Sequence, residues 1–134
     1  MSVPRADAQI ADEIKKYFAE NPNENVFVGQ FDIGGNPKVL AGAAQTGKTL
    51  SKAVYVFSPD SETGKVAHVN YLPADVLEKK VLDAKVWLGE VSKVIGGKGG
   101  GKPDSASGVG SETDKIAEAI ETARKVFKEK VEGA

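Results

Sequence analysis

Hydrophobic residues near the start of the chain recur at helical spacing. Ile10, Ile14 and Tyr17 with Phe18 predict an amphipathic helix over residues 6–20, and the acidic Asp7 and Asp12 favour its start. The pattern then changes to an alternation of apolar and polar positions over residues 26–33, which is typical of a half-buried strand. The first part of the chain is therefore expected to form a helix followed by a strand.

A second helix and a pair of strands are expected in the middle of the chain. Asn36 is a suitable N-cap and Pro37 a suitable first helical residue, and the small residues that follow would let this helix pack closely on a sheet. Residues 53–57 and 65–72 are rich in β-branched and aromatic side chains, and residues 58–64 between them have the composition of a turn. The two strands are predicted to pair as a hairpin.

The last third is expected to contain two helices separated by a glycine-rich loop. Apolar residues at helical spacing predict a helix over residues 84–95 with Asp83 as its N-cap. Seven glycines in residues 96–110 favour a loop, and Ser111 is suited to cap a final helix. The order α-β-α-β-β-α-Gly loop-α predicts an α+β fold, in which a small, mainly antiparallel sheet is covered by helices.

Composition limits the size of the core and the kinds of site. A chain of 134 residues with 40% hydrophobic residues can bury one sizeable core, and no apolar stretch approaches the roughly 20 residues of a membrane-spanning helix. The chain has no cysteine and one histidine, His68, so it offers too few ligands for a transition-metal centre. We therefore expect a cytoplasmic protein with no metal, no cofactor and no membrane partner.

Lysines and glycines are concentrated in one part of a chain whose formal net charge is only -1. Residues 79–103 contain six lysines and two acidic residues, so their local net charge is +4. Five glycines within residues 96–101 can bring backbone N–H groups close to an anion, and Lys98 and Lys102 lie among them. The segment predicts contacts to phosphate and sugar rather than reading of bases. A flexible linker is the passive alternative.

The nine residues Gly96-Gly-Lys-Gly-Gly-Gly-Lys-Pro-Asp104 follow an amphipathic helix. They closely resemble the C-terminal signature of alanyl-tRNA synthetases, whose domain is of the DHH-associated type also found behind DHH phosphoesterases. The resemblance extends in outline over residues 26–131. It favours a division into an N-terminal helix at residues 1–24, which includes the start of the expressed chain, and a DHH-associated domain at residues 25–134.

Three positions depart from the family pattern. Lys102 stands where many members have arginine, Ser105 where they often have a bulky apolar residue, and Ser107 where they often have glutamine. The chain also has neither the His-x-x-x-His zinc motif of the editing domain nor the DHH triplet of the phosphoesterases. The chain alone is therefore not expected to catalyse a reaction, although the parent implied by the resemblance is an alanine–tRNA ligase.

The resemblance implies a domain that contacts the outer corner of the L-shaped tRNA and helps to couple aminoacylation with editing. The implied partners are tRNA, alanine-specific in the parent enzyme, and the parent's catalytic and editing domains; a homodimer is a further option. The expected RNA-binding residues are Lys85, Lys93, Gly96, Gly97, Lys98, Gly99, Gly100, Gly101 and Lys102.

Two other functions remain open. Residues 42–49, Gly-Ala-Ala-Gln-Thr-Gly-Lys-Thr, match the pattern of a phosphate-binding P-loop, which would suit an enzyme acting on a phosphate ligand. A working P-loop follows a strand and opens a helix, whereas the order expected here is reversed. The other alternative is a protein-interaction or dimerisation module. His68, in an alternating strand, and Trp87, on an apolar helix face, are expected to have structural roles.

Overall fold

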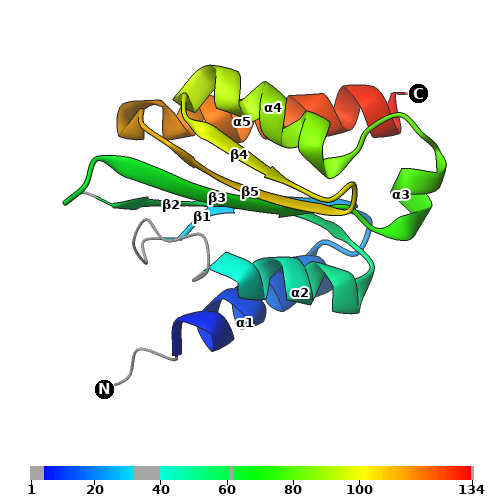
Figure 1. The fold of residues 1–134 in the computed structure, drawn as a ribbon. Coiled ribbons are helices and arrows are strands. Elements are labelled where there is room, and N and C mark those ends of the chain that lie inside the picture. Colours follow the sequence, from blue (N-terminus) through cyan, green and yellow to red (C-terminus); the bar gives the residue numbers. More distant parts are fainter. Residues whose placement is uncertain (1–4, 32–39, 61, 134) are drawn as a thin grey trace.

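A β-sheet forms the middle layer of the molecule. The structure is a computed structural model that describes residues 5–31, 40–60 and 62–133. Figure 1 shows the sheet between two layers of helices. This is the α+β arrangement that the sequence predicts, and within the described residues it buries apolar side chains on both faces of the sheet.

The strands are β1 (Val26–Gln30), β2 (Ala53–Asp60), β3 (Lys65–Tyr71), β4 (Lys98–Gly101) and β5 (Ser105–Gly110). They form a five-stranded sheet in the order β1-β2-β3-β5-β4. Among the described strands, β1 and β2 pair in parallel, and the other neighbours are antiparallel. The parallel pair needs a long crossover, which contains a helix, whereas short turns join the hairpins. As a result, the glycine-rich β4 lies at one edge of the sheet.

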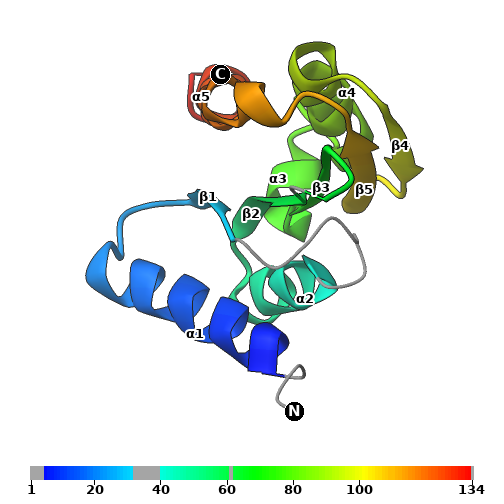
Figure 2. The ribbon, with the colours of Figure 1, turned by 90° about the vertical axis from the view of Figure 1, so that its left-hand side faces the viewer.

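Helices cover both faces of the sheet. Figure 2 shows α1 (Arg5–Glu20) and α2 (Ala41–Leu50) on one face, with α4 (Ala84–Ile95) and α5 (Ile116–Phe127) on the other. The shorter elements are α3 (Ala74–Glu78), the 3-10 helix η2 (Thr113–Lys115) and the π-helix η3 (Lys128–Glu132). Within the described ranges, no helix is long and apolar enough to cross a membrane.

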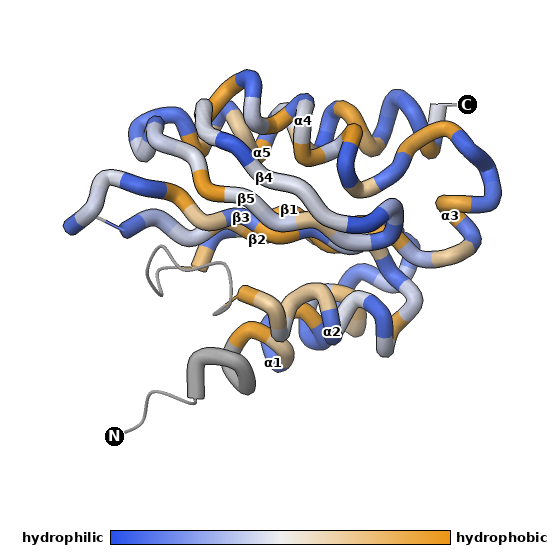
Figure 3. The backbone as a smooth tube through the Cα atoms, in the orientation of Figure 1, coloured by the Kyte–Doolittle hydropathy of each residue, from blue (hydrophilic) through white to orange (hydrophobic). Residues whose placement is uncertain are grey.

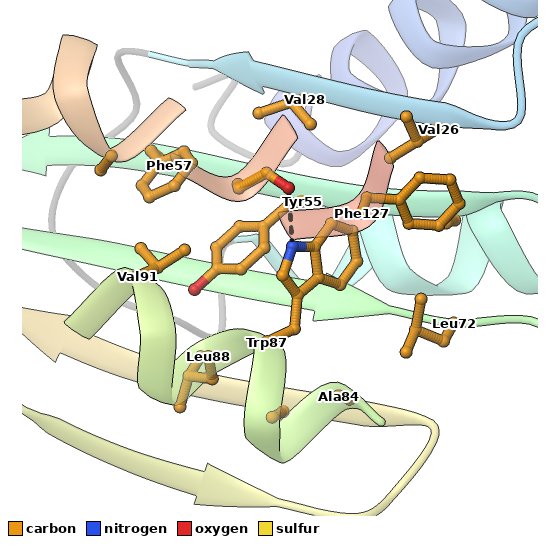
Figure 4. Close-up of a cluster of buried hydrophobic side chains, with 14 of the residues drawn as sticks. Val26, Val28, Tyr55, Phe57, Leu72, Ala84, Trp87, Leu88, Val91 and Phe127 are labelled. Atoms are coloured by element: carbon orange, nitrogen blue, oxygen red, sulfur yellow. Dashed lines mark hydrogen bonds between the residues drawn. The ribbon is translucent and has the colours of Figure 1, made fainter. Parts of the chain in front are cut away.

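Trp87 lies at the centre of the core between the sheet and the α4–α5 layer. Its side chain is fully buried, and the indole N–H donates a 2.9 Å hydrogen bond to the Ala123 carbonyl, drawn as a dashed line in Figure 4. Its ring meets Tyr55 edge-on, with centroids 5.0 Å apart, and the centroid of Phe127 is 5.6 Å away. Because its donor is satisfied, Trp87 can be buried without the cost of an unpaired polar group. The structural role predicted for it is confirmed.

A second core lies between the sheet and the α1–α2 layer. Ile10 and Ile14 of α1 are fully buried there, and Phe18 is 7% exposed. Strand β2 serves both cores, since Val54 points to this side and Tyr55 to the other. The helix predicted over residues 6–20 is confirmed, and its apolar face is the one that the spacing indicates.

Two further local predictions are confirmed, while others fall partly outside the described residues. Strands β2 and β3 pair as the predicted hairpin, with Phe57 opposite His68. The Asp83 carboxylate caps α4 by accepting a 2.8 Å hydrogen bond from the Val86 N–H. The caps proposed for the second helix, Asn36 and Pro37, lie outside the described residues, as does the end of the first predicted strand.

The glycine-rich segment predicted as a loop is a β-hairpin. Strand β4 pairs with β5 in an antiparallel register that sets Gly99 opposite Gly108 and Gly101 opposite Ala106. Figure 3 shows this hairpin as a mostly pale stretch, in contrast to the orange segments that face the cores. Glycine has a low strand propensity, so the local composition favoured a loop, but pairing with the already anchored β5 overrides it. This part of the predicted element order is therefore corrected.

Two other features near the ends of α4 and α5 differ from the predictions. Ser111 does not cap the last helix, because α5 begins at Ile116 and Lys115 occupies its N-cap position. The N–H groups of Ser111 and Glu112 instead donate to the Ile95 carbonyl at 2.8 and 3.0 Å, at the end of α4. The 3-10 helix η2 then precedes α5 without a side-chain cap. Helix α3 was not predicted, since five residues are too few to show a helical period.

Candidate functional site

The exposed edge of the sheet is formed by the glycines and lysines of β4. All four residues of this strand, Lys98 to Gly101, are exposed. Beyond its end the Lys102 N–H donates a 2.7 Å hydrogen bond to the Ser105 carbonyl, which makes these two residues a hydrogen-bonded pair. Because such pairs alternate along an antiparallel ladder, the N–H groups of Gly99 and Gly101 fall outside the ladder with β5. The edge therefore offers backbone donors as well as ammonium groups.

Most glycines of this segment are required by the fold. Gly96 and Gly97 have φ of +73° and +82°, a region that favours glycine, and they turn the chain from α4 into β4. A Cβ on Gly97 would collide with the Val109 carbonyl oxygen, and one on Gly99 would collide with the Ser107 carbonyl oxygen. At Gly100, in contrast, an added Cβ would meet nothing within 4 Å. The fold explains the first three glycines but not Gly100.

A groove of about 370 Å³ runs between α4 and β4. Two of the predicted lysines line it, Lys85 from the helix and Lys98 from the strand. The remaining lining residues are Leu88, Gly89, Ser92, Gly97, Gly99 and Gly100. The structure thus brings predicted site residues from the helix and from the glycine-rich segment together in one groove: Lys85, Gly97, Lys98, Gly99 and Gly100.

Five of the nine predicted site residues therefore line this groove, and four lie outside it. Lys102 and Gly101 line a second pocket, of about 360 Å³, together with Ala41 and Ala44 of α2 and with Ser105 and Ser107. The Lys93 ammonium lies in the last turn of α4 and forms a 3.2 Å ion pair with Glu90. That side chain is 73% exposed, so the ion pair is weak and leaves Lys93 able to exchange partners.

Sequence reasoning missed three residues of the α4–β4 groove, Leu88, Gly89 and Ser92. Gly89 and Ser92 lie on the same face of α4 as Lys85, at the helical spacing i, i+4 and i+7. That spacing is readable from the sequence, but the expectation of a loop after residue 95 removed the strand that forms the opposite wall. Without β4 in place, nothing marked this face of the helix as the side of a groove.

His68 is buried beneath the glycine hairpin and has no access to this edge. Its Nδ1 lies 2.7 Å from the Tyr55 hydroxyl, while its Nε2 is buried without a hydrogen-bond partner. Burial lowers the pKa of His68 from 6.5 to about 4, so the imidazole is neutral at physiological pH. The imidazole packs in the core beside the rings of Tyr55 and Phe57, with centroids 5.8 and 5.9 Å away. Its predicted structural role agrees with this position.

The P-loop pattern at residues 42–49 lies entirely within α2. A phosphate-binding loop must curl around its ligand at the start of a helix, whereas here the Thr46 and Thr49 hydroxyls donate to the Gly42 and Gln45 carbonyls inside the helix. Strand β2 follows the pattern instead of preceding it. In the part of the chain that the structure describes, no group of three or more His, Cys, Asp or Glu residues could hold a metal ion.

Residues 23–129 match the DHHA1 domain family. The chain belongs to this family. The match contains the whole sheet, α4, α5 and the glycine hairpin. A solved structure with the same fold is the C-Ala domain of the alanyl-tRNA synthetase from Aquifex aeolicus, which is 28% identical, covers 75% of this chain and 88% of that domain, and has a TM-score of 0.65.

Similar proteins include full-length alanine–tRNA ligases. The cytoplasmic enzyme of Dictyostelium discoideum is 35% identical over 91% of this DHHA1 chain, and that of Drosophila melanogaster is 34% identical over 91%. A mitochondrial alanine–tRNA ligase of Saccharomyces cerevisiae also matches. The chain spans only 14% and 13% of the length of the first two relatives, so the similarity covers one domain of a much longer enzyme.

Proposed function

We propose that the chain is the tRNA-binding C-terminal domain of an alanine–tRNA ligase and forms no covalent bond with a substrate itself. The observation that carries this proposal is the exposed β4 edge, where Lys98 and Lys102 flank three glycines with accessible backbone. Lysine ammonium groups and backbone N–H groups donate hydrogen bonds to phosphate oxygens. Membership of the DHHA1 family and similarity to alanine–tRNA ligases support tRNA as the nucleic acid.

The nine predicted residues remain the proposed RNA contacts. Lys85 and Lys98 would meet the RNA in the α4–β4 groove, Lys102 at the second pocket, and Lys93 near the end of α4. The glycines would contribute by close approach of their backbone. Such contacts read the shape and charge of a folded RNA more than its bases.

The same proposal extends to the organisation of the parent enzyme. Residues 25–134 would form the DHH-associated domain and residues 1–24 a preceding helical segment. By contacting the outer corner of tRNA, the domain would help to hold aminoacylation and editing modules on the same tRNA, and those modules would be its partners within the parent. We place the parent in the cytoplasm, in agreement with the relatives whose names give that compartment.

An interaction or dimerisation module is the second candidate. Val86 is 46% exposed, and it lines a pocket with the apolar residues Leu77, Val81 and Leu82. An exposed apolar group of this kind can contribute to a protein interface. This face lies on the side of α4 that does not line the groove with β4, so both candidates can be tested on the same domain.

The experiment is a binding isotherm of the isolated domain with a folded tRNA, measured at several salt concentrations. We expect the affinity to fall as salt rises, because each phosphate contact releases counterions. An unstructured RNA of equal length should compete less well, since no aromatic stacking platform lies at the β4 edge within the described residues. Absence of RNA binding at low salt, with self-association in sedimentation, would favour the interaction module instead.

A further inference from the structure

Gly89 is a glycine in the middle of α4 that the packing of the domain does not explain. It is exposed on the groove side of the helix, and an added Cβ would meet nothing within 4 Å. Glycine is among the least favourable residues inside a helix, whereas alanine is the most favourable. The position would therefore hold alanine at no steric cost to the described part of the protein.

Gly89 differs in this respect from the glycines on the opposite wall of the groove. A Cβ on Gly99 would lie 2.8 Å from the Leu88 side chain and would also collide with β5, and Gly97 has a positive φ. Glycine is required at position 99 by the close approach of α4 and β5, and at position 97 by the positive φ. Gly89 instead leaves open the space above the groove, which is available to a ligand.

The groups around this space are complementary to an anion that accepts hydrogen bonds. Lys85 and Lys98 provide ammonium groups from opposite walls, and Ser92 provides a hydroxyl. No carboxylate is among the lining residues of the described chain, and the nearby Glu90 is already paired with Lys93. The narrow space between a helix and a strand suits a chain of phosphodiesters better than a flat base, because no aromatic ring lines it.

We propose that the α4–β4 groove holds the sugar–phosphate backbone of the bound RNA and that Gly89 is the residue that lets the backbone enter. The inference rests on the proposed function and adds the face of β4 on which the RNA lies. Lys85 and Lys98 contact phosphates from the two walls, with Ser92 as a further donor. The pocket on the other face of the hairpin, which Ser105 and Ser107 line, is then not the main RNA-binding site.

The test uses Gly89→Gln and Gly89→Ala in the isolated domain, with tRNA affinity measured at fixed salt. Glutamine is a good helix former without charge, so it fills the groove and leaves the electrostatic field unchanged. We expect Gly89→Gln to weaken tRNA binding on the order of tenfold, which is the loss expected for about one hydrogen bond to a charged group. Gly89→Ala should weaken binding less and raise the urea midpoint of unfolding.

Two matched variants separate the possible outcomes. Val86→Gln makes the same addition at a residue of α4 that does not line this groove and should leave tRNA affinity unchanged. Ser107→Gln fills the opposite pocket, where Lys102 is the proposed contact, and should weaken binding less than Gly89→Gln does. If wild type binds tRNA but Gly89→Gln binds equally well, the groove assignment is wrong while tRNA binding stands. A loss confined to Ser107→Gln would move the RNA to the other face. If wild type binds no tRNA, the proposed function fails, and this inference fails with it.

Discussion

The hairpins β2–β3 and β4–β5 lie in the same sheet and are stabilised in different ways. In β2–β3 almost every side chain is buried, including Tyr55 and Phe57, so hydrophobic burial on both faces stabilises the pair. In β4 every residue is exposed, and its pairing with β5 depends on backbone contacts that only glycine permits. The first hairpin uses its residues to build the core. The second leaves its backbone and lysines free for a ligand.

The largest expected effect is on the core that supports the first hairpin. Trp87→Ala should lower the free energy of unfolding by about 3–5 kcal/mol, the range for removing a large buried aromatic side chain, because Trp87 is fully buried against Tyr55. Urea denaturation monitored by circular dichroism measures this change. Val86→Ala, one residue earlier and 46% exposed, should change stability by less than about 0.5 kcal/mol. Equal losses in the two variants would contradict the assignment of the core.

The second effect arises where the two hairpins meet, at His68 opposite Gly108. Burial lowers the pKa of His68 to about 4 from 6.5, so below pH 6.5 the unfolded chain binds a proton that the folded chain does not. Folding stability should therefore fall as pH decreases from about 6.5 to about 4, by up to roughly 3 kcal/mol.

The carboxyl groups of the chain also titrate at the low end of this range, so the measurement is a difference. Unfolding free energies of wild type and His68→Asn are compared between pH 7 and pH 4. The wild type should lose more stability than the variant over that interval. If the unfolding free energies of wild type and His68→Asn fell equally between pH 7 and pH 4, His68 would be protonated in the folded state or accessible to solvent.

The third effect separates the glycines that the hairpin needs from the one that it does not. Gly97→Ala places a side chain at φ +82° and against the Val109 carbonyl, and the positive φ alone costs roughly 1–2 kcal/mol. Gly100→Ala, with open space around the new Cβ, should change stability by less than about 0.5 kcal/mol. The rate of amide hydrogen exchange in β4 and β5 measures how much each substitution loosens the hairpin. Similar exchange in the two variants would show that β4 is not held by close backbone contact.

The comparison also explains which parts of the fold are predictable from the sequence. Hairpin β2–β3 and helix α4 were predictable because their own residues carry the signal: β-branched and aromatic side chains around a turn, and an apolar helical period after Asp83. Hairpin β4–β5 was not, because glycine does not favour a strand, and β4 joins the sheet through its pairing with β5, which itself pairs with β3. Helix α3 was not predictable either, because its five residues are too few to show a helical period of apolar positions.

The candidate site was predictable in composition but not in shape. The lysines and glycines of residues 96–102 are visible in the sequence, and they lie on one exposed edge. The groove is not visible, because its walls are α4 and a strand that was expected to be a loop. Gly89 could be recognised only when the space around its Cα was known.

The central claim is that the lysines of the β4 edge bind the phosphates of tRNA. The most direct measurement is the salt dependence of tRNA affinity for wild type and for the double variant Lys98→Ala, Lys102→Ala. Removing two phosphate contacts should reduce the slope of log affinity against log salt by roughly one to two units. The double variant Lys15→Ala, Lys16→Ala, which removes two exposed lysines of α1, is the control of equal charge and should keep the wild-type slope. A folded Lys98→Ala, Lys102→Ala variant with unchanged affinity and unchanged slope would contradict the account.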